Sequence, residues 1–126
     1  MTASIVVVGS LNMDLVIRAP RIPRPGETII GGEFHTVPGG KGANQAVGVR
    51  RLGADATMVG RVGDDLFGEF LRKTLEGEGV DVRGLRVSSE ARTTLAIIAK
   101  PLFAAAVVVH QSADPVVRPG QLPPRV

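Results

Sequence analysis

Apolar residues near the start of the chain change from a continuous run to an alternating pattern. Ser4–Val8 is an unbroken, mostly β-branched run that ends at Gly9, which is typical of a strand buried on both faces in a parallel sheet. Apolar and polar residues then alternate over 11–18, which predicts a second strand with one buried face. A period of two places Asn12 and Asp14 on the same face of that strand, opposite most of its apolar side chains.

The rest of the chain alternates between strand and helix patterns. Strands are predicted at about 27–37, 56–59, 80–87 and 93–99, and helices at about 42–52 and 66–76. Gly53 follows the first helix as a C′ glycine would, and Asp64 or Asp65 is placed to cap the second. Small residues including Gly48 favour close packing of the first helix, and an apolar stripe that includes Phe70 and Leu71 marks the buried face of the second. This order of elements predicts an α/β fold with a parallel sheet.

Three glycines occur within four positions in the segment 39–46, followed by small helix formers. Glycine accepts positive φ and has no Cβ to hold a ligand away from the main chain. A helix that begins here adds free N–H donors and the positive end of its dipole. Lys41 and Asn44, three positions apart, share one face of the first turn. The segment therefore predicts a small polar site suited to hydroxyls or anionic groups.

Two common nucleotide-binding motifs are excluded by counting. A Walker A loop needs a glycine five positions before Gly40 and a Ser or Thr after the lysine, but His35 and Gly42 stand there. A dinucleotide-binding fingerprint needs Gly-x-Gly-x-x-Gly directly after a first strand, and Gln45 stands where its third glycine belongs. The glycine segment is therefore neither of these phosphate-binding loops.

Asn12 and Asp14 are the second candidate for binding chemistry. Residues two apart on a strand are separated by about 7 Å, and a carboxylate beside an amide suits neighbouring sugar hydroxyls. The alternative is that Asp14 is a solvated strand residue and that Asn12 belongs to a turn after Gly9 and Ser10. These residues alone leave both interpretations open.

Composition restricts the class of protein. The chain has 126 residues, 44% of them hydrophobic and 3% aromatic, so it has room for one small domain with an aliphatic core. It contains no cysteine, which excludes disulfides and thiolate metal sites. The first strand begins too early to leave room for a signal peptide, and no apolar run reaches the length of a membrane span. We therefore expect a cytoplasmic protein with no membrane partner.

The formal net charge of +3 does not by itself predict a nucleic-acid partner. The basic residues are scattered along the chain, and it has no Tyr or Trp on which bases could stack. The pair Arg50-Arg51 lies near the predicted end of a helix, where cations interact favourably with the dipole. We therefore expect no nucleic-acid partner.

Four motifs occur in a fixed order along the chain: Gly9-Ser10-Leu11-Asn12-Met13-Asp14, Arg24-Pro25-Gly26-Glu27-Thr28, Pro38-Gly39-Gly40-Lys41-Gly42-Ala43-Asn44-Gln45-Ala46 and Val62-Gly63-Asp64-Asp65-Leu66-Phe67-Gly68. In this order and spacing, over about residues 5–94, the chain resembles the N-terminal part of the PfkB family of carbohydrate and nucleoside kinases. The lysine and the Ala-Asn-Gln-Ala sequence resemble the ribokinase branch of that family more than its fructokinases or adenosine kinases.

The resemblance implies a partial ribokinase-like fold, in which a doubly wound, Rossmann-like sheet carries a small β lid and the C-terminal nucleotide-binding part is absent. Residues 1–110 would form the N-terminal part of that domain. Strands at about 11–18, 27–37, 94–99 and 104–109 would leave the main sheet and form the lid over the sugar. Residues 111–126 diverge from the family, and we expect a mobile tail there. Lid-to-lid contacts within the family imply a homo-oligomer.

The resemblance also implies a sugar-binding role for named residues. Those matching Asn12 and Asp14 hydrogen-bond sugar hydroxyls in the family. The other side of the sugar is lined by the residues that match Gly40, Lys41, Gly42, Ala43 and Asn44. The family reaction is ATP-dependent phosphorylation of the D-ribose 5-hydroxyl, with Mg²⁺ and a monovalent cation. The resemblance therefore implies D-ribose or a close pentose as the ligand.

The resemblance does not extend to the catalytic apparatus. The family's catalytic aspartate lies in a Gly-Ala-Gly-Asp segment, whose glycines form a helix N-terminus that stabilises the transferring phosphoryl group. No such segment occurs in this sequence. Because phosphoryl transfer depends on positioning and charge stabilisation, we expect no catalytic residue, no retained cofactor and no kinase activity from this chain alone. The alternatives are a truncated kinase, a non-catalytic dimerisation or sugar-binding module, and one half of a split enzyme.

Overall fold

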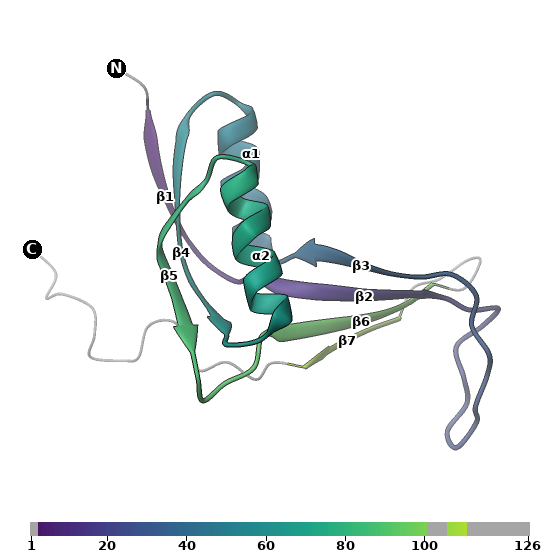
Figure 1. The fold of residues 1–126 in the computed structure, drawn as a ribbon. Coiled ribbons are helices and arrows are strands. Elements are labelled where there is room, and N and C mark those ends of the chain that lie inside the picture. Colours follow the sequence, from purple (N-terminus) through teal and green to yellow (C-terminus); the bar gives the residue numbers. More distant parts are fainter. Residues whose placement is uncertain (1–2, 101–105, 111–126) are drawn as a thin grey trace, which may run out of the picture.

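A computed structural model describes residues 3–100 and 106–110, which form two helices and seven strands (Figure 1). The elements are β1 (Ser4–Val8), β2 (Asn12–Arg18), β3 (Phe34–Gly39), α1 (Lys41–Arg51), β4 (Asp55–Gly63), α2 (Leu66–Gly77), β5 (Asp81–Ser88), β6 (Thr94–Lys100) and β7 (Ala106–His110). The predicted tail at 111–126 lies outside the described residues. In the part that the structure describes, neither helix is long and apolar enough to cross a membrane.

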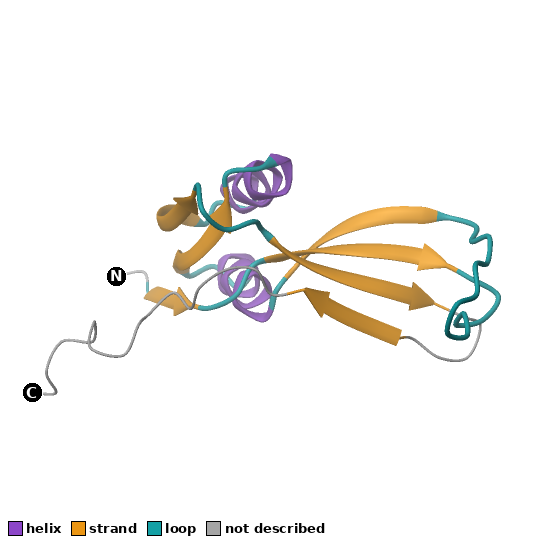
Figure 2. Ribbon diagram, turned by 90° about the horizontal axis from the view of Figure 1, so that it is seen from below, coloured by secondary structure: helices purple, strands orange, loops and turns teal. Residues whose placement is uncertain are grey.

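The first sheet has three parallel strands in the order β1-β4-β5. α1 connects β1 to β4 by way of β2 and β3, and α2 connects β4 directly to β5. Because the strand order advances in one direction and such crossovers are right-handed, both helices lie on the same side of the sheet, as Figures 1 and 2 show. The predicted α/β fold with a parallel sheet is confirmed.

The hydrophobic core lies between the first sheet and the two helices. Its most deeply buried side chains include Ala46, Met58 and Leu71, each no more than 1% exposed. The stripe predicted for α2 is correct at Leu71 but wrong at Phe70, which is 49% exposed. Among the described strands β1 pairs only with β4, and its Val6 remains 61% exposed. The far face of this sheet is therefore apolar and open at β1, and the prediction that this strand is buried on both faces is wrong.

The second sheet has four strands in the order β3-β2-β6-β7. β2 pairs with β6 in parallel, whereas the β2–β3 and β6–β7 pairs are antiparallel. In Figure 2 this sheet extends away from the helices and from the first sheet. A second β sheet thus lies beside the parallel one, as predicted, and it has four strands where the parallel sheet has three.

The predicted strand after the proline-rich turn is wrong over its first half, since β3 begins only at Phe34. Two glycines interrupt the pairing before that point. A Cβ added to Gly31 would lie 2.6 Å from Cδ1 of Ile17, so the chain passes too close to β2 for a side chain. The N–H of Gly32 donates to the carbonyl of Arg18 at 2.7 Å. The segment before β3 thus touches the end of β2 without forming a regular ladder.

Both helix boundaries follow the local chemistry that predicted them. Gly53, directly after the C-cap of α1, has a φ of +89°, which a C′ glycine adopts without strain. α2 is capped by Asp65, whose carboxylate accepts the N–H of Gly68 at 2.9 Å. Of the two acids offered for this cap, Asp65 is therefore the one that forms it.

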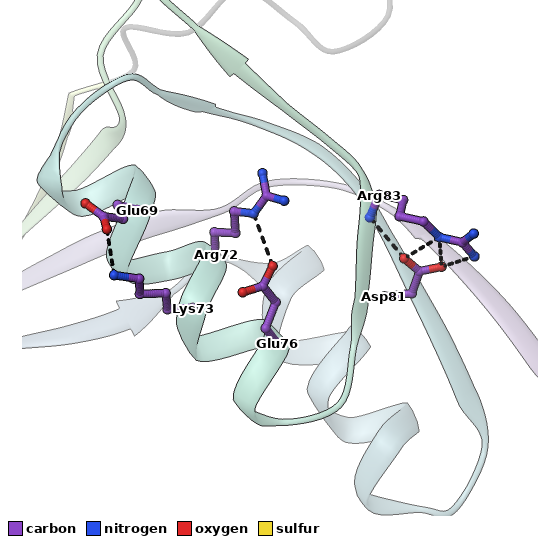
Figure 3. A network of polar contacts seen from close by, with 6 residues as sticks. All are labelled: Glu69, Arg72, Lys73, Glu76, Asp81 and Arg83. Carbon is purple, nitrogen blue, oxygen red and sulfur yellow. Dashed lines mark hydrogen bonds and ion pairs between the residues drawn. The ribbon is translucent and has the colours of Figure 1, made fainter.

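Exposed ion pairs connect side chains along α2 and at the start of β5 (Figure 3). Lys73 donates to Glu69 at 2.6 Å and Arg72 donates to Glu76 at 3.2 Å, both across one helical turn. The guanidinium of Arg83 donates to the carboxylate of Asp81, which also accepts the Arg83 backbone N–H at 3.0 Å. Exposed pairs of this kind add little to stability at neutral pH.

The contribution of the Asp81 carboxylate to stability is expected to be lost in acid. The Arg83 hydrogen bonds lower the pKa of Asp81 from 3.8 to about 2. Because the folded-state pKa is depressed, this contribution is present above the unfolded pKa and is lost as pH falls through the folded one. Asp81→Asn should flatten the pH dependence of the melting temperature between about pH 4 and pH 2. Arg83→Gln should flatten the same region, and an unchanged acid limb in both variants would contradict this assignment.

Candidate functional site

Asn12 and Asp14 occupy one face at the start of β2, as their spacing predicts. The amide of Asn12 donates a hydrogen bond to Oδ1 of Asp14, and both residues are half-buried. Val16, the next residue on this face, is only 6% exposed. The polar part of this face is therefore confined to Asn12 and Asp14 at the start of β2, where the chain passes from the first sheet to the second.

The neighbouring strands place small side chains beside this pair. Gly39 of β3 and Thr94 of β6 are the register partners of Asn12. Ala96 of β6 is the partner of Asp14 on one side, and it is 5% exposed. Cross-strand partners share a face of the sheet, so the carboxylate is bordered by the small Ala96 on one side and by Val37 of β3, which is 40% exposed, on the other.

Gly39 and Gly40 join the polar pair to the start of α1. A Cβ added to Gly39 would lie 2.8 Å from Oδ1 of Asp14 and 3.0 Å from Nδ2 of Asn12. Gly40 has a φ of +103°, and a Cβ there would lie 2.5 Å from the carbonyl oxygen of Ser10. Gly40 therefore requires glycine because of its φ and the backbone beside it, whereas a side chain at Gly39 would displace the side chains of Asn12 and Asp14.

The first turn of α1 separates exposed from packed residues. Lys41 and Asn44 are exposed, whereas Gly42 and Ala43 are buried. The N–H of Ala43 donates to the carbonyl of Ser10 at 3.2 Å, which ties this turn to the link between β1 and β2. The predicted site residues on α1 thus divide into two with exposed side chains and two that hold the turn in place.

The sequence suggested Gly48 as the glycine that permits close packing of α1. In the structure this glycine is Gly42. A Cβ on Gly42 would lie 2.8 Å from Cα of Gly9, whereas a Cβ on Gly48 would meet nothing within 4 Å. The helix entrance is therefore pressed backbone to backbone against the end of β1. In the sequence, the indication of this contact was that Gly9 and Gly42 are both glycines on segments that cross.

The electrostatics of the helix entrance favour oxygen-rich ligands. α1, which lies wholly within the described residues, has no capping side chain and no acidic residue in its first turn. Its positive dipole end is therefore not neutralised locally, and Lys41 adds a cation. On the other side of Gly39 lies a carboxylate that only accepts hydrogen bonds, beside an amide that also donates. This combination suits vicinal hydroxyl groups, which both donate and accept.

The site shares no residue with a pocket of about 460 Å³ at the N-terminal end of α2, which Asp64, Asp65 and Val87 help to line. Within residues 3–100 and 106–110, no three His, Cys, Asp or Glu side chains gather as a metal site.

A buried hydrogen-bond cluster at the same end of the molecule was missed by sequence reasoning. Thr93, 2% exposed, donates its hydroxyl to Oδ1 of Asp65 at 2.7 Å and its N–H to Oδ2 at 2.8 Å. Its hydroxyl also accepts the N–H of Gly63 at 3.0 Å. The Gly-Asp-Asp motif was a signal for Asp65, but nothing in the sequence pointed to Thr93.

These contacts determine the ionisation of Asp65. Burial by itself raises the pKa of the carboxyl, but hydrogen bonds from Thr93 and Gly68 and the charge of Arg92 lower the pKa below its ordinary value. Asp65 is therefore held as a carboxylate that accepts from three donors.

Similarity to known proteins extends over most of the chain. The model of the pfkB family of carbohydrate kinases matches residues 2–100. A ribokinase of Bacillus subtilis is 53% identical over 77 residues, which are 61% of this chain and 26% of that protein. A fructokinase of Klebsiella pneumoniae is 43% identical over 96 residues, which are 74% of this chain and 31% of that protein.

The fold is similar to that of solved kinase structures. The structure of Arabidopsis thaliana ribokinase complexed with ribose and ATP aligns with a TM-score of 0.80 at 33% identity, covering 87% of this chain and 36% of that one. The chain thus spans about a quarter to a third of the length of the curated relatives it matches.

Proposed function

The chain belongs to the PfkB family of carbohydrate kinases, as its motifs predict, and from this premise we propose that it binds D-ribose or a close pentose as the sugar-binding part of a ribokinase-like enzyme. The observation that carries the proposal is the packing of Gly39 against the hydrogen-bonded pair Asn12 and Asp14. A fructokinase is among the relatives, so the choice of a pentose rests on the ribokinases and on the ribose-bound structure.

Each proposed residue has a distinct task. Asp14 accepts hydrogen bonds from two neighbouring hydroxyls, while Asn12 donates to one oxygen and accepts from another. Lys41 and Asn44 approach from the helix side, where the dipole favours oxygen atoms. Gly40 brings this side close to the strand pair, and the packed turn of Gly42 and Ala43 holds it there. A sugar that lacks one of the hydroxyls leaves a polar group unpaired, which is the basis of discrimination.

The family reaction adds a phosphoryl group to the sugar. In it, ATP supplies that group, and the 5-hydroxyl of D-ribose receives it. The residues assigned here bind and orient the sugar, and none is assigned to the transfer, for which the family uses its Gly-Ala-Gly-Asp segment. We therefore expect the purified 126-residue chain to bind ribose without phosphorylating it. ATP-dependent phosphorylation of ribose by this chain would contradict that expectation.

Calorimetry with D-ribose tests the binding proposal. Asp14→Ala should weaken ribose binding by about 10- to 100-fold, because a hydrogen bond to a charged group contributes roughly 1.5–3 kcal/mol. Asp64→Ala is the matched control, since it removes an exposed carboxylate outside the proposed site and should leave the affinity unchanged. Equal affinity in the parent and Asp14→Ala would remove Asp14 from the site. No binding of ribose by the parent chain would refute the proposed function.

A second candidate function is self-association through β3. This strand lies at the edge of the second sheet, and its Phe34 and Val37 are 61% and 40% exposed. An unpaired edge with apolar side chains is a template for pairing with another strand. Two copies could therefore join edge to edge, as the family resemblance implies for the lid.

Sedimentation at several concentrations tests this association. The parent should show a concentration-dependent dimer, and Phe34→Lys should weaken it by roughly 10-fold or more, since burial of a Phe contributes about 1.5–3 kcal/mol. Leu52→Lys is the control, because Leu52 is 89% exposed and lies after α1. A parent that remains monomeric at all concentrations would exclude this candidate.

A further inference from the structure

Asp65 connects the two sheets of the molecule at the point where the chain passes from β5 to β6. We propose that it is a positioning residue for the sugar site, because it holds the start of β6 beside Asn12 and Asp14 of β2. This inference rests on the proposed function, since it concerns the placement of the same binding residues. Asp65 itself does not belong to the set assigned to the sugar.

The contacts of Asp65 and Thr93 together join three segments. Its Oδ1 accepts the N–H of Gly68 at 2.9 Å and the hydroxyl of Thr93 at 2.7 Å, and its Oδ2 accepts the N–H of Thr93 at 2.8 Å. The same hydroxyl accepts the N–H of Gly63, at the end of β4, at 3.0 Å. One carboxylate thus joins the first turn of α2 to the residue before β6, 28 positions later in the chain.

Glycines make this approach possible. A Cβ on Gly63 would lie 2.5 Å from both Oδ2 of Asp65 and the backbone nitrogen of Thr93. A Cβ on Gly68 would lie 2.2 Å from the carbonyl oxygen of Gly63. The glycines on either side of Asp65 therefore clear the space in which the carboxylate and Thr93 meet. A helix cap alone would not need this clearance.

Thr93 links Asp65 to the sugar site because it directly precedes β6, which pairs with β2. The next residue, Thr94, is the register partner of Asn12, and Ala96 is the partner of Asp14. β6 is reached from β5 through residues 89–93 alone, and Thr93 is the buried end of that link. A shift at this point moves β6 along β2 and changes the small residues that border the carboxylate. Strand register is sensitive to such shifts, because one residue of slip exchanges the two faces.

An Asp65→Asn variant separates this role from capping. Asn is as good an N-cap as Asp, so the bond to Gly68 can be retained. An amide has one acceptor oxygen where the carboxylate has two, so the variant cannot accept from both groups of Thr93. Thr93→Val removes the hydroxyl from the other side, and Thr93→Ser restores it. Asp64→Asn, with the same change of charge at an exposed neighbour, is the control.

Two measurements on the full chain decide the proposal. In hydrogen exchange, Asp65→Asn and Thr93→Val should each speed exchange of the amides in 94–100 by about 10-fold, the loss of roughly one charge-assisted hydrogen bond. The amides of α2 should exchange as in the parent. The ribose affinity should also fall, because β6 in the folded variants is no longer held in the arrangement that borders Asn12 and Asp14. Thr93→Ser and Asp64→Asn should resemble the parent in both measurements.

Other results would overturn the proposal. Parent-like exchange in 94–100 would show that Asp65 does not hold β6. Faster exchange over all elements alike would show plain destabilisation. Faster exchange in 94–100 with unchanged ribose affinity would show that β6 does not position the site. A parent that does not bind ribose refutes the proposed function and with it the role at the sugar site, while the exchange data still decide whether Asp65 holds β6.

Discussion

Gly40→Ala is expected to destabilise the chain by about 3 kcal/mol, because strain and a backbone collision coincide at this position. The φ of +103° is one that side-chain-bearing residues rarely adopt. The added Cβ would also lie 2.5 Å from the carbonyl oxygen of Ser10 and 2.8 Å from Cα of Leu11. Neither group can rotate aside, since both belong to the main chain between β1 and β2.

Urea unfolding of a matched pair checks this prediction. Gly53 also has a positive φ, +89°, but a Cβ there meets nothing within 4 Å. Gly53→Ala should therefore cost only the conformational strain, about 1 kcal/mol. A free energy of unfolding that falls equally in the two variants would show that the contact of Gly40 with Ser10 has no consequence. Ribose binding should also be lost in Gly40→Ala wherever the variant remains folded.

Gly42→Ala is the second large effect, and it should displace the whole of α1. The Cβ would lie 2.8 Å from the Cα and the carbonyl carbon of Gly9 and 2.9 Å from the nitrogen of Ser10. Overpacking of this kind costs about 1–3 kcal/mol, which exceeds the roughly 1 kcal/mol that alanine gains over glycine in a helix. The helix can relieve the contact only by moving away from β1, which separates Asn44 from the strand pair.

Gly48→Ala in the same helix is the control with the opposite sign. A Cβ at Gly48 meets nothing within 4 Å, so the helix propensity of alanine should stabilise the chain by about 0.5–1 kcal/mol. Urea unfolding gives the stability of both variants, and calorimetry gives their affinity for ribose. A stabilised Gly42→Ala with parent-like affinity would show that the helix entrance tolerates a side chain, contrary to the structure.

The elements predicted best from sequence were those whose signals are local. The apolar run of β1, the alternation of β2 and the glycine after α1 each depend on a few adjacent residues. The prediction of a strand before Phe34 was wrong because it used only the apolar residues of that segment. It took no account of the close approach of Gly31 to Ile17. That contact depends on where two strands meet, which no local pattern reports. The prediction that Phe70 is buried was wrong for a similar reason, since the width of the buried stripe of α2 depends on the sheet against which it packs.

The features of the candidate site also differ in whether local sequence patterns could predict them. The spacing of Asn12 and Asp14 was enough to place both on one face, because a strand repeats every two residues. The contact of Gly39 with the carboxylate depends on the register of β2 and β3 and could not be read from spacing. Thr93 meets Asp65 across 28 positions. A buried threonine carries no sequence signal of its partner, so only the fold reveals this contact.

The open edge of β1 has a consequence for assembly. In the described residues β1 pairs only with β4, and β3 pairs only with β2, so two different sheets each end in an unpaired strand. Copies that join through β3 still present β1 on the outside, with Val6 and Val8 59–61% exposed. An association that uses two unlike edges forms a ring where its rotation closes and an open filament where it does not. We therefore expect copies that pair through both edges to grow beyond a dimer at high concentration, which sedimentation of the chain would detect.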